Sequence, residues 1–232
     1  MEDGLLFHYL LRALGLRTYM APARSRSRDL NNIPSGDYVG ISHLVHIVTL
    51  DNGARYALDV SFGGDGPTLP LALEAGVVVT NLGRQQVRLM HQHLPRHREP
   101  DGQPKHWIYE YRNGMDKEWN AFYSFAEYEF FPEDFVAINY GVAKDPVDSW
   151  QTALVLLVKF VLGRSDDGEE GVVGKVMMKD GLLKRNMGGK TELLQTCETE
   201  AERVEAIKEW FGITLTPEEQ ASIKGWRTEL KG

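Results

Sequence analysis

The chain has 232 residues, of which 42% are hydrophobic and 25% charged, the proportions of a globular protein that can bury one large core or two small ones. Its formal net charge of −7 argues against nucleic acid and an anionic membrane as partners, although an arginine cluster at 24–28 leaves room for an anionic cofactor. The single cysteine, Cys197, excludes an internal disulfide and is typical of a reducing compartment, here the cytoplasm.

The first predicted element is a helix over residues 4–14, with Asp3 as its N-cap and Gly15 just after its end. Its apolar stripe, spaced i, i+3, i+4 and i+7, consists of Phe7, Leu10, Leu11 and Leu14. A helix so apolar this near the first residue predicts that packing partners lie upstream of Met1. We therefore expect the chain alone to be less stable than a version extended upstream. Residues 5–16 lack the basic region and the cleavage site of a signal peptide.

Strands follow this helix and predict a small barrel or sandwich. A polar loop is expected at 24–38, and an exposed loop rich in histidine and proline at 91–105. The alternation of Trp107, Tyr109 and Tyr111 predicts a strand face packed in the core or in a substrate pocket. The predicted strands cover residues 16–23, the hairpin 41–64, and residues 76–80, 86–91 and 106–112.

The remainder of the chain predicts a mixture of helices and strands. The expected helices cover residues 132–135, 149–162 and 200–210. The apolar run 153–162 is too short to cross a bilayer, so we expect a core helix there and no membrane span. A charged loop is expected at 163–171, and a hairpin over 172–184 around Lys179 and Asp180. A further helix starts at Thr216, where Thr-Pro-Glu-Glu forms a capping box.

The predicted hairpin at 41–64 carries a histidine and an aspartate within apolar strands. Two alternating, β-branched runs flank Asp51-Asn52-Gly53, a turn signal. With a two-residue turn, Asp59 lies opposite His46. With a three-residue loop, Asp59 lies opposite Val45 and has His43 as its diagonal neighbour, about 7–8 Å away at Cα. The periodicity alone leaves both histidines as candidates.

An imidazole and a carboxylate on one hairpin face form the orienting half of a nucleophilic triad. A lone histidine in a strand is more often structural, but Asp59 needs a partner because a buried carboxylate is costly. The residues alone therefore leave a catalytic pair and a coincidence both open. His91, His93 and His97 lack a cysteine or an ordered carboxylate to complete a site, so we expect no metal.

At the hairpin the chain resembles the arylamine N-acetyltransferase family. The resemblance rests on His43 at the head of its apolar strand, the Asp-Asn-Gly turn, Tyr56-Ala-Leu-Asp59-Val-Ser-Phe62-Gly63, and Pro70-Leu71. Supporting matches follow at 127–135, at Asn139, at 145–149 and at 193–215. Because the family's catalytic histidine opens its strand, the resemblance favours His43 and the three-residue loop.

The resemblance implies an α+β fold. Its parts would be a remnant of an N-terminal helical bundle at 1–16, an antiparallel β-barrel at 17–135 and an α/β lid at 136–232. It also implies ping-pong transfer of an acetyl or larger acyl group from acetyl-CoA to an aromatic amine or hydrazine, with His43 as base and Asp59 as its orienter. The glycines Gly63, Gly64 and Gly66 are candidate CoA contacts, although a turn that ends the strand explains them equally well.

The chain departs from the family pattern at its start. The family's nucleophile is the cysteine of Arg-Gly-Gly-x-Cys-x-Glu at the head of a helix, and Glu2 matches the glutamate of that motif. The cysteine is therefore expected upstream of Met1. Cys197 does not replace it, because its C-terminal context predicts a packed thiol. We expect the 232-residue chain to be inactive. The alternatives are a short form that binds CoA, an amine or a protein partner, and a non-catalytic domain.

Overall fold

The computed structural model describes residues 1–28, 34–144, 153–164, 168 and 170–232. The chain divides into two compact units, Met1–Tyr140 and Gly141–Gly232, each with a hydrophobic core of its own. The predicted borders at 16/17 and 135/136 stay predictions. Among the described residues, none of the helices is long and apolar enough to cross a membrane.

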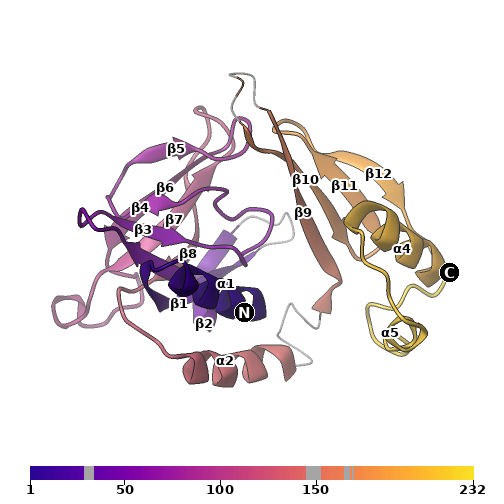
Figure 1. The fold of residues 1–232 in the computed structure, drawn as a ribbon, viewed down its shortest axis with the longest axis horizontal. Helices are drawn as coiled ribbons and strands as arrows, with labels where there is room; N and C mark the ends of the chain where they lie inside the picture. The colour runs from indigo at the N-terminus through magenta and orange to yellow at the C-terminus, as the bar shows by residue number, and fades with distance from the viewer. Residues whose placement is uncertain (29–33, 145–152, 165–167, 169) are drawn as a thin grey trace. The chain divides into compact units, whose positions relative to one another are not determined.

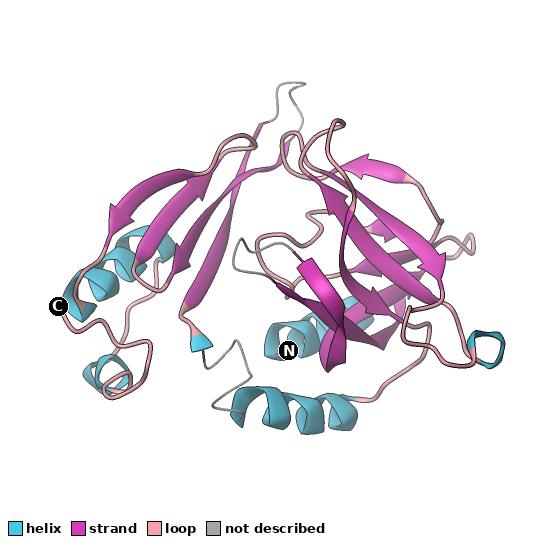
Figure 2. Cartoon of the chain, turned by 180° about the vertical axis from the view of Figure 1, so that it is seen from behind, coloured by secondary structure: helices cyan, strands magenta, loops and turns pink. Residues whose placement is uncertain are grey.

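The first unit is built on an eight-stranded sheet in the order β4-β3-β2-β1-β8-β7-β6-β5, in which paired neighbours are antiparallel (Figures 1 and 2). The strands are β1 Arg17–Arg28, β2 Pro34–Thr49, β3 Arg55–Leu58, β4 Leu71–Ala72, β5 Val78–Thr80, β6 Gln86–Gln92, β7 His106–Arg112 and β8 Asn120–Phe125. This sheet forms a half-barrel, and the fold is α+β as predicted.

The core of this unit lies on one face of the sheet, because alternate strand residues point to the same side. Trp107, Tyr109 and Tyr111 of β7 all belong to this core, as their alternation predicts. Val45 and Ile47 of β2 join them and are fully buried.

The polar segment 24–38 is not the predicted loop, since β1 runs on to Arg28 and β2 begins at Pro34. Arg26 shows why strand structure persists here. Its guanidinium donates to the Gly36 carbonyl oxygen at 2.7 and 3.0 Å and to that of Ala121 at 3.3 Å. The polar residues of this segment therefore belong to the exposed ends of β1 and β2. Residues 29–33 lie outside the described residues.

Helix α1, Glu2–Ala13, packs against β1 and β2 (Figure 1). The predicted N-cap Asp3 is wrong, because Met1 occupies that position, whereas Gly15 ends the helix at φ +79° as predicted. The buried face is also not the predicted apolar stripe. It consists of Gly4, His8 and Leu11, whereas Leu10 and Leu14 are 52% and 68% exposed. Close approach at Gly4 selects this face: a Cβ atom there would lie 2.8 Å from Leu44 Cδ1.

Helix α2, Pro132–Lys144, extends well beyond the predicted residues 132–135. Its Phe135 is fully buried in a small cluster with Met20 of β1 and Leu44 of β2. Met1 and Leu5 of the first turns of α1 pack against the same cluster. The start of α1 therefore lies beside Leu44, the residue that follows His43.

The second unit holds a four-stranded antiparallel sheet in the order β12-β11-β10-β9 (Figure 1). Its elements are β9 Leu156–Arg164, β10 Glu170–Lys179, β11 Leu182–Asn186, β12 Glu192–Thr196, α4 Glu200–Ala206, η2 Ile207–Phe211 and α5 Pro217–Ala221. The core joins Met178 and Leu183 of the sheet to Ile207 after α4. The predicted hairpin around Asp180 and the capping box at Thr216 are both confirmed.

The predicted helix at 149–162 is wrong in its described part, because residues 156–164 form β9 and pair with β10. A short apolar run cannot be assigned by periodicity alone, and this run is rich in β-branched and aromatic residues that favour a strand. Residues 145–152, which include the 145–149 segment of the family resemblance, lie outside the described residues, as do 165–167 and 169 of the charged loop.

Candidate functional site

The hairpin between β2 and β3 has the three-residue loop. His46 pairs with Leu58 and Thr49 with Arg55, which is the register expected for the Asp51-Asn52-Gly53 loop. The Leu50 backbone N–H donates to the Ala54 carbonyl oxygen at 2.9 Å, and Gly53 takes the left-handed φ of +84° that such a loop requires. Of the two possible registers, the structure thus has the one that favours His43.

This register brings His43 and Asp59 into contact. His43 Nε2 lies 2.7 Å from Asp59 Oδ2, and the two side chains are 10% and 1% exposed. Asp59 lies just past the end of β3 at Leu58, so its side chain turns toward His43 instead of standing across the ladder. The two side chains thus form a buried hydrogen-bonded pair, the arrangement that a catalytic pair requires, and their catalytic role stays a prediction.

Asp59 is held as a carboxylate. Its Oδ1 accepts the backbone N–H groups of Ser61 at 3.0 Å and Phe62 at 3.1 Å. Burial alone would raise the pKa of this carboxyl group, but the charge and hydrogen bond of His43, the Ser61 N–H and the Tyr123 hydroxyl together lower its pKa. The carboxylate is therefore a fixed negative charge that orients the imidazole.

The ring of His43 is also fixed by its aromatic neighbours. The rings of Phe62 and Tyr123 meet it edge-on, with centroids 5.3 and 5.5 Å away. With Nε2 bound to Asp59, the ring nitrogen left for chemistry is Nδ1. Tyr123 was missed from the sequence because strand β8 was not predicted, although the alternation of Phe125, Tyr123 and Ala121 was its signal.

His46, the rival histidine, lies on the opposite face of β2. Its ring stacks on His8 of α1 at 5.9 Å and meets Phe7 edge-on at 5.2 Å. Burial, with repulsion from His8, lowers the pKa of His46 to about 4. The Asp59 charge and backbone groups of Gly4 and Leu58 offset this only in part. His46 is therefore a neutral packing residue beneath α1.

The glycine turn that follows Asp59 has clear structural reasons. Gly63 has φ +93°, and the Gly66 N–H donates to the Gly63 carbonyl oxygen at 3.0 Å. A Cβ atom at Gly66 would lie 3.2 Å from that oxygen, so a side chain there would require the turn to shift. The Tyr109 hydroxyl anchors the turn by donating to the Asp65 carbonyl oxygen at 3.0 Å. Contact of Gly63, Gly64 and Gly66 with CoA stays a prediction.

Comparison with known proteins identifies the family. A family model described as N-acetyltransferase matches residues 1–220. The chain belongs to the N-acetyltransferase family. The one cysteine of this family member, Cys197, is buried in the core of the second unit. Burial and the Glu202 carboxylate raise the pKa of its thiol. Cys197 is thus the packed thiol that was predicted.

The curated relatives of this N-acetyltransferase family member are longer than the chain. It is 27% identical over 223 residues to N-malonyltransferase FDB2 of Fusarium pseudograminearum, and 26% identical over 234 residues to N-malonyltransferase FDB2 of Gibberella moniliformis. The matches cover 94% and 96% of this chain but only 63% and 66% of those proteins. The chain therefore spans about two thirds of the length of these relatives.

Solved structures show the same fold. The arylamine N-acetyltransferase of Salmonella typhimurium superposes with a TM-score of 0.71 at 21% identity, covering 94% of this chain and 71% of that one. The enzyme of Mycobacterium marinum in complex with CoA gives a TM-score of 0.64 at 23% identity, covering 90% and 66%. These likenesses support the arylamine N-acetyltransferase fold for the described units.

The sequence predicts that His91, His93 and His97 do not form a metal site. His91 stacks on Trp107 at 4.3 Å, and the ring centroids of His97 and His106 are 5.4 Å apart. Among the described residues, no group of three or more histidine, cysteine, aspartate or glutamate side chains is arranged to hold a metal ion.

Proposed function

We propose that this chain carries the histidine–aspartate part of an acyltransferase that moves an acyl group from acyl-CoA to an aromatic amine or hydrazine in the cytoplasm. The observation that carries the proposal is the 2.7 Å contact between His43 Nε2 and Asp59 Oδ2 in a chain of the N-acetyltransferase family. The carboxylate fixes the ring so that Nδ1 is the nitrogen free to exchange a proton.

The proposed reaction is ping-pong transfer through a thioester. In the first half, a cysteine thiol gives its proton to His43 Nδ1, its sulfur bonds to the acyl carbonyl carbon, and the carbon–sulfur bond to CoA breaks. The proton on His43 passes to the departing CoA thiolate. In the second half, the amine nitrogen bonds to the carbonyl carbon of the enzyme thioester and the carbon–sulfur bond to the cysteine breaks. The proton lost by the amine passes through His43 Nδ1 to the cysteine sulfur, which restores the thiol.

The thiol of this reaction is proposed to come from residues that precede Met1. The first turns of α1 pack beside Leu44, next to His43 along β2, so a residue just before this helix would reach the site. A helix N-terminus also favours a thiolate. Within the 232 residues the only cysteine is the buried Cys197.

The acyl donor is proposed to be a CoA thioester, with acetyl-CoA as the donor that the family resemblance implies. The names of the curated relatives add malonyl-CoA as a second donor to test. The glycine turn of Gly63, Gly64 and Gly66, next to Asp59, is the proposed CoA contact, because backbone without side chains allows close approach.

The proposal is tested by measuring CoA thiol release with acetyl-CoA or malonyl-CoA and an arylamine. We expect no turnover by the 232-residue chain and turnover by a version extended upstream with an Arg-Gly-Gly-x-Cys segment. In the extended version, His43→Gln and Asp59→Asn each abolish most activity, whereas the control His91→Gln, at an exposed position, keeps it. Turnover by the 232-residue chain, or full activity of His43→Gln, would refute the mechanism.

The alternative function is a non-catalytic form that binds CoA or a protein partner. The M. marinum relative solved with CoA supports a CoA-binding surface in this fold. Calorimetric titration of the 232-residue chain with CoA separates the two: binding without thiol release, even after the extension is added, favours the non-catalytic form.

A further inference from the structure

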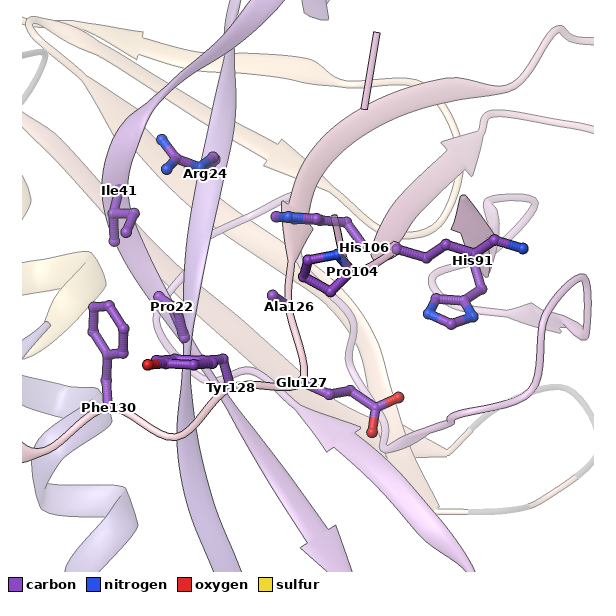
Figure 3. Close-up of a pocket in the computed structure, with 11 residues that line it drawn as sticks. Pro22, Arg24, Ile41, His91, Pro104, His106, Ala126, Glu127, Tyr128 and Phe130 are labelled. Atoms are coloured by element: carbon purple, nitrogen blue, oxygen red, sulfur yellow. The ribbon is translucent and has the colours of Figure 1, made fainter. Parts of the chain in front are cut away.

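A pocket lies in the first unit, away from the His43–Asp59 pair. It has a volume of about 390 Å³ and is open to solvent between β1, β2, the end of β6, the start of β7 and the segment after β8 (Figure 3). Its size is that of a small-ligand pocket. Figure 3 shows Arg24 and Ile41 on one side of it, Tyr128 and Phe130 on another, and His106 with Pro104 on a third.

The β1 and β2 residues that line the pocket lie on the opposite face of the sheet from His43. Pro22 and Arg24 line the pocket, and they alternate along β1 with Ala21 and Ala23, which are buried in the core. Ala23 pairs with His43, so His43 shares the core side. Ile41 lies two residues before His43 yet pairs with Arg24, because the register shifts at this point and leaves Ser42 as an extra residue. The bulge turns Ile41 to the pocket face.

The charged side chains that line the pocket are two basic ones, Arg24 and Lys105, and one acidic one, Glu127. The imidazoles of His91 and His106 line it as well. The Arg24 guanidinium uses one donor on the Val39 carbonyl oxygen at 3.3 Å, and Lys105 forms no ion pair with a described residue.

The one carboxylate of the lining, Glu127, is already engaged. It lies 2.5 Å from Arg55 and accepts the Trp107 indole N–H at 2.7 Å. Because that negative charge is offset by Arg55, the basic groups are left to attract an anion.

The lowered pKa of His106 also indicates that the surroundings of the pocket disfavour a further positive charge. Burial lowers its pKa to about 4, and repulsion from His97, Arg24, His91 and His93 adds to the effect. An anion in the pocket would relieve that repulsion.

The pocket also offers an aromatic corner. The rings of Tyr128 and Phe130 meet edge-on, with centroids 5.8 Å apart, and Tyr128 is 64% exposed. A planar ring entering this corner stacks on one of them and meets the other at its edge, the two arrangements that aromatic rings favour. Pro22 and Ile41 extend the apolar wall (Figure 3).

We propose that this pocket binds a small aromatic carboxylate, with the ring against Tyr128 and Phe130 and the carboxylate on Arg24 and Lys105. A guanidinium recognises a planar carboxylate through paired hydrogen bonds, and Figure 3 shows Arg24 on a different side of the pocket from Tyr128, which suits a ligand with a charged end and a flat end. This ligand is separate from the substrates of the proposed acyl transfer, because Arg24, which would hold its carboxylate, lies on the face of β1 that points away from His43.

The test is isothermal titration calorimetry of the 232-residue chain with benzoate. Three further probes each lack at least one feature of benzoate. Benzamide has the ring without the charge, acetate has the carboxylate without the ring, and inorganic phosphate has charge but neither the ring nor a planar carboxylate. We expect saturable benzoate binding, with the three other probes at least about tenfold weaker, since one charge-assisted contact is worth roughly a factor of ten or more.

Matched variants locate the site. Arg24→Gln and Tyr128→Ser are each expected to weaken benzoate binding by roughly tenfold. Arg96→Gln and Tyr140→Ser, at positions 67% and 68% exposed that do not line the pocket, are expected to leave it unchanged. If Arg24→Gln lowers the melting temperature, Lys105→Gln at an exposed position replaces it.

Benzoate binding that survives Arg24→Gln and Lys105→Gln, or phosphate binding as tight as benzoate, would overturn the proposal. Loss of binding in His43→Gln would also overturn it, because that result places the ligand at the His43–Asp59 pair. None of these outcomes depends on acyl transfer by the chain, so failure of the proposed function and failure of this site are distinguishable.

Discussion

Asp59 shows how one charged residue within an apolar strand can indicate a functional site. A carboxylate in an apolar strand signals a partner because its burial is costly without one, and that argument from the sequence pointed to a nearby histidine. Which histidine it was could not be derived from periodicity, because a one-residue slip exchanges His43 and His46. The bonds that hold Asp59, from Ser61, Phe62 and Tyr123, depend on a backbone turn and on a strand far along the chain.

The Asp59→Asn variant tests how much this carboxylate contributes. We expect the free energy of unfolding to fall by about 1–3 kcal/mol, because the charge-assisted bond to His43 is lost. The pKa of Asp59 is lower in the folded chain, so its contribution is present above the ordinary value and is lost as pH falls through the folded value.

The gap between the native chain and Asp59→Asn in urea titrations should therefore narrow below about pH 4. The control is Asp37→Asn, whose side chain is 63% exposed and which should change stability by less than about 0.5 kcal/mol. A gap that stays constant down to about pH 2 would contradict this role of the charge.

Among the elements, α1 and β9 show where patterns in the sequence mislead. The periodicity of α1 was real, but packing chose Gly4, His8 and Leu11 as its buried face, since a glycine opposite Leu44 allows the closest approach. The apolar run 153–162 is compatible with a core helix, and its pairing with β10 makes residues 156–164 a strand instead. The β2–β3 hairpin was predictable because its turn residues and its alternation agree with each other.

The exposed side of α1 allows a direct test. We expect the double variant Leu10→Lys and Leu14→Lys to change the free energy of unfolding by less than about 0.5 kcal/mol and to reduce binding of a hydrophobic dye, because both side chains are largely exposed. Leu11→Lys, at a position 4% exposed, should cost roughly 3 kcal/mol or more in urea titrations, because it buries a charge.

Equal losses in the two variants would show that Leu10 and Leu14 are packed after all. The same double variant made in a version extended upstream tests whether this side of α1 packs against the added residues. There we predict that it lowers stability, because the extension is expected to cover these leucines.

At the level of the whole molecule, the fold class followed from the family motif and the strand signals, whereas the details of the second unit did not. Strand β12 and the packing of α4 on its sheet depend on contacts distant in sequence, which a local pattern does not contain. The pocket near Tyr128 could not be predicted either, because the segments that line it come from five parts of the chain.

Buried histidines should make the whole molecule sensitive to acid. The pKa values of His46 and His106 are lowered to about 4, and that of His8 is lowered as well, chiefly by burial. Each folded value lies below the unfolded one, so the unfolded chain binds more protons and stability falls as pH drops from about 6.5 to about 4. For His46 alone the loss between about pH 7.5 and about pH 5 is roughly 2 kcal/mol.

The check is urea unfolding of the native chain and His46→Leu at these two pH values. The variant should lose less stability on acidification, whereas the control His91→Leu, at an exposed position, should behave as the native chain does. An equal loss in the native chain and in His46→Leu would show that His46 is not the acid-sensitive group.

The extra residue at Ser42 has a consequence for how this protein tolerates changes in length. Because Ser42 has no partner in β1, removal of this one residue would leave Ile41 opposite Arg24 and His43 opposite Ala23 and would restore regular pairing. A deletion of a single codon here is therefore expected to be tolerated, whereas deletion of the paired residue Leu44 would turn His43 and everything before it in β2 to the other face. Substitution of Ser42 itself, whose hydroxyl meets that of Ser25 at 3.1 Å, should also be mild.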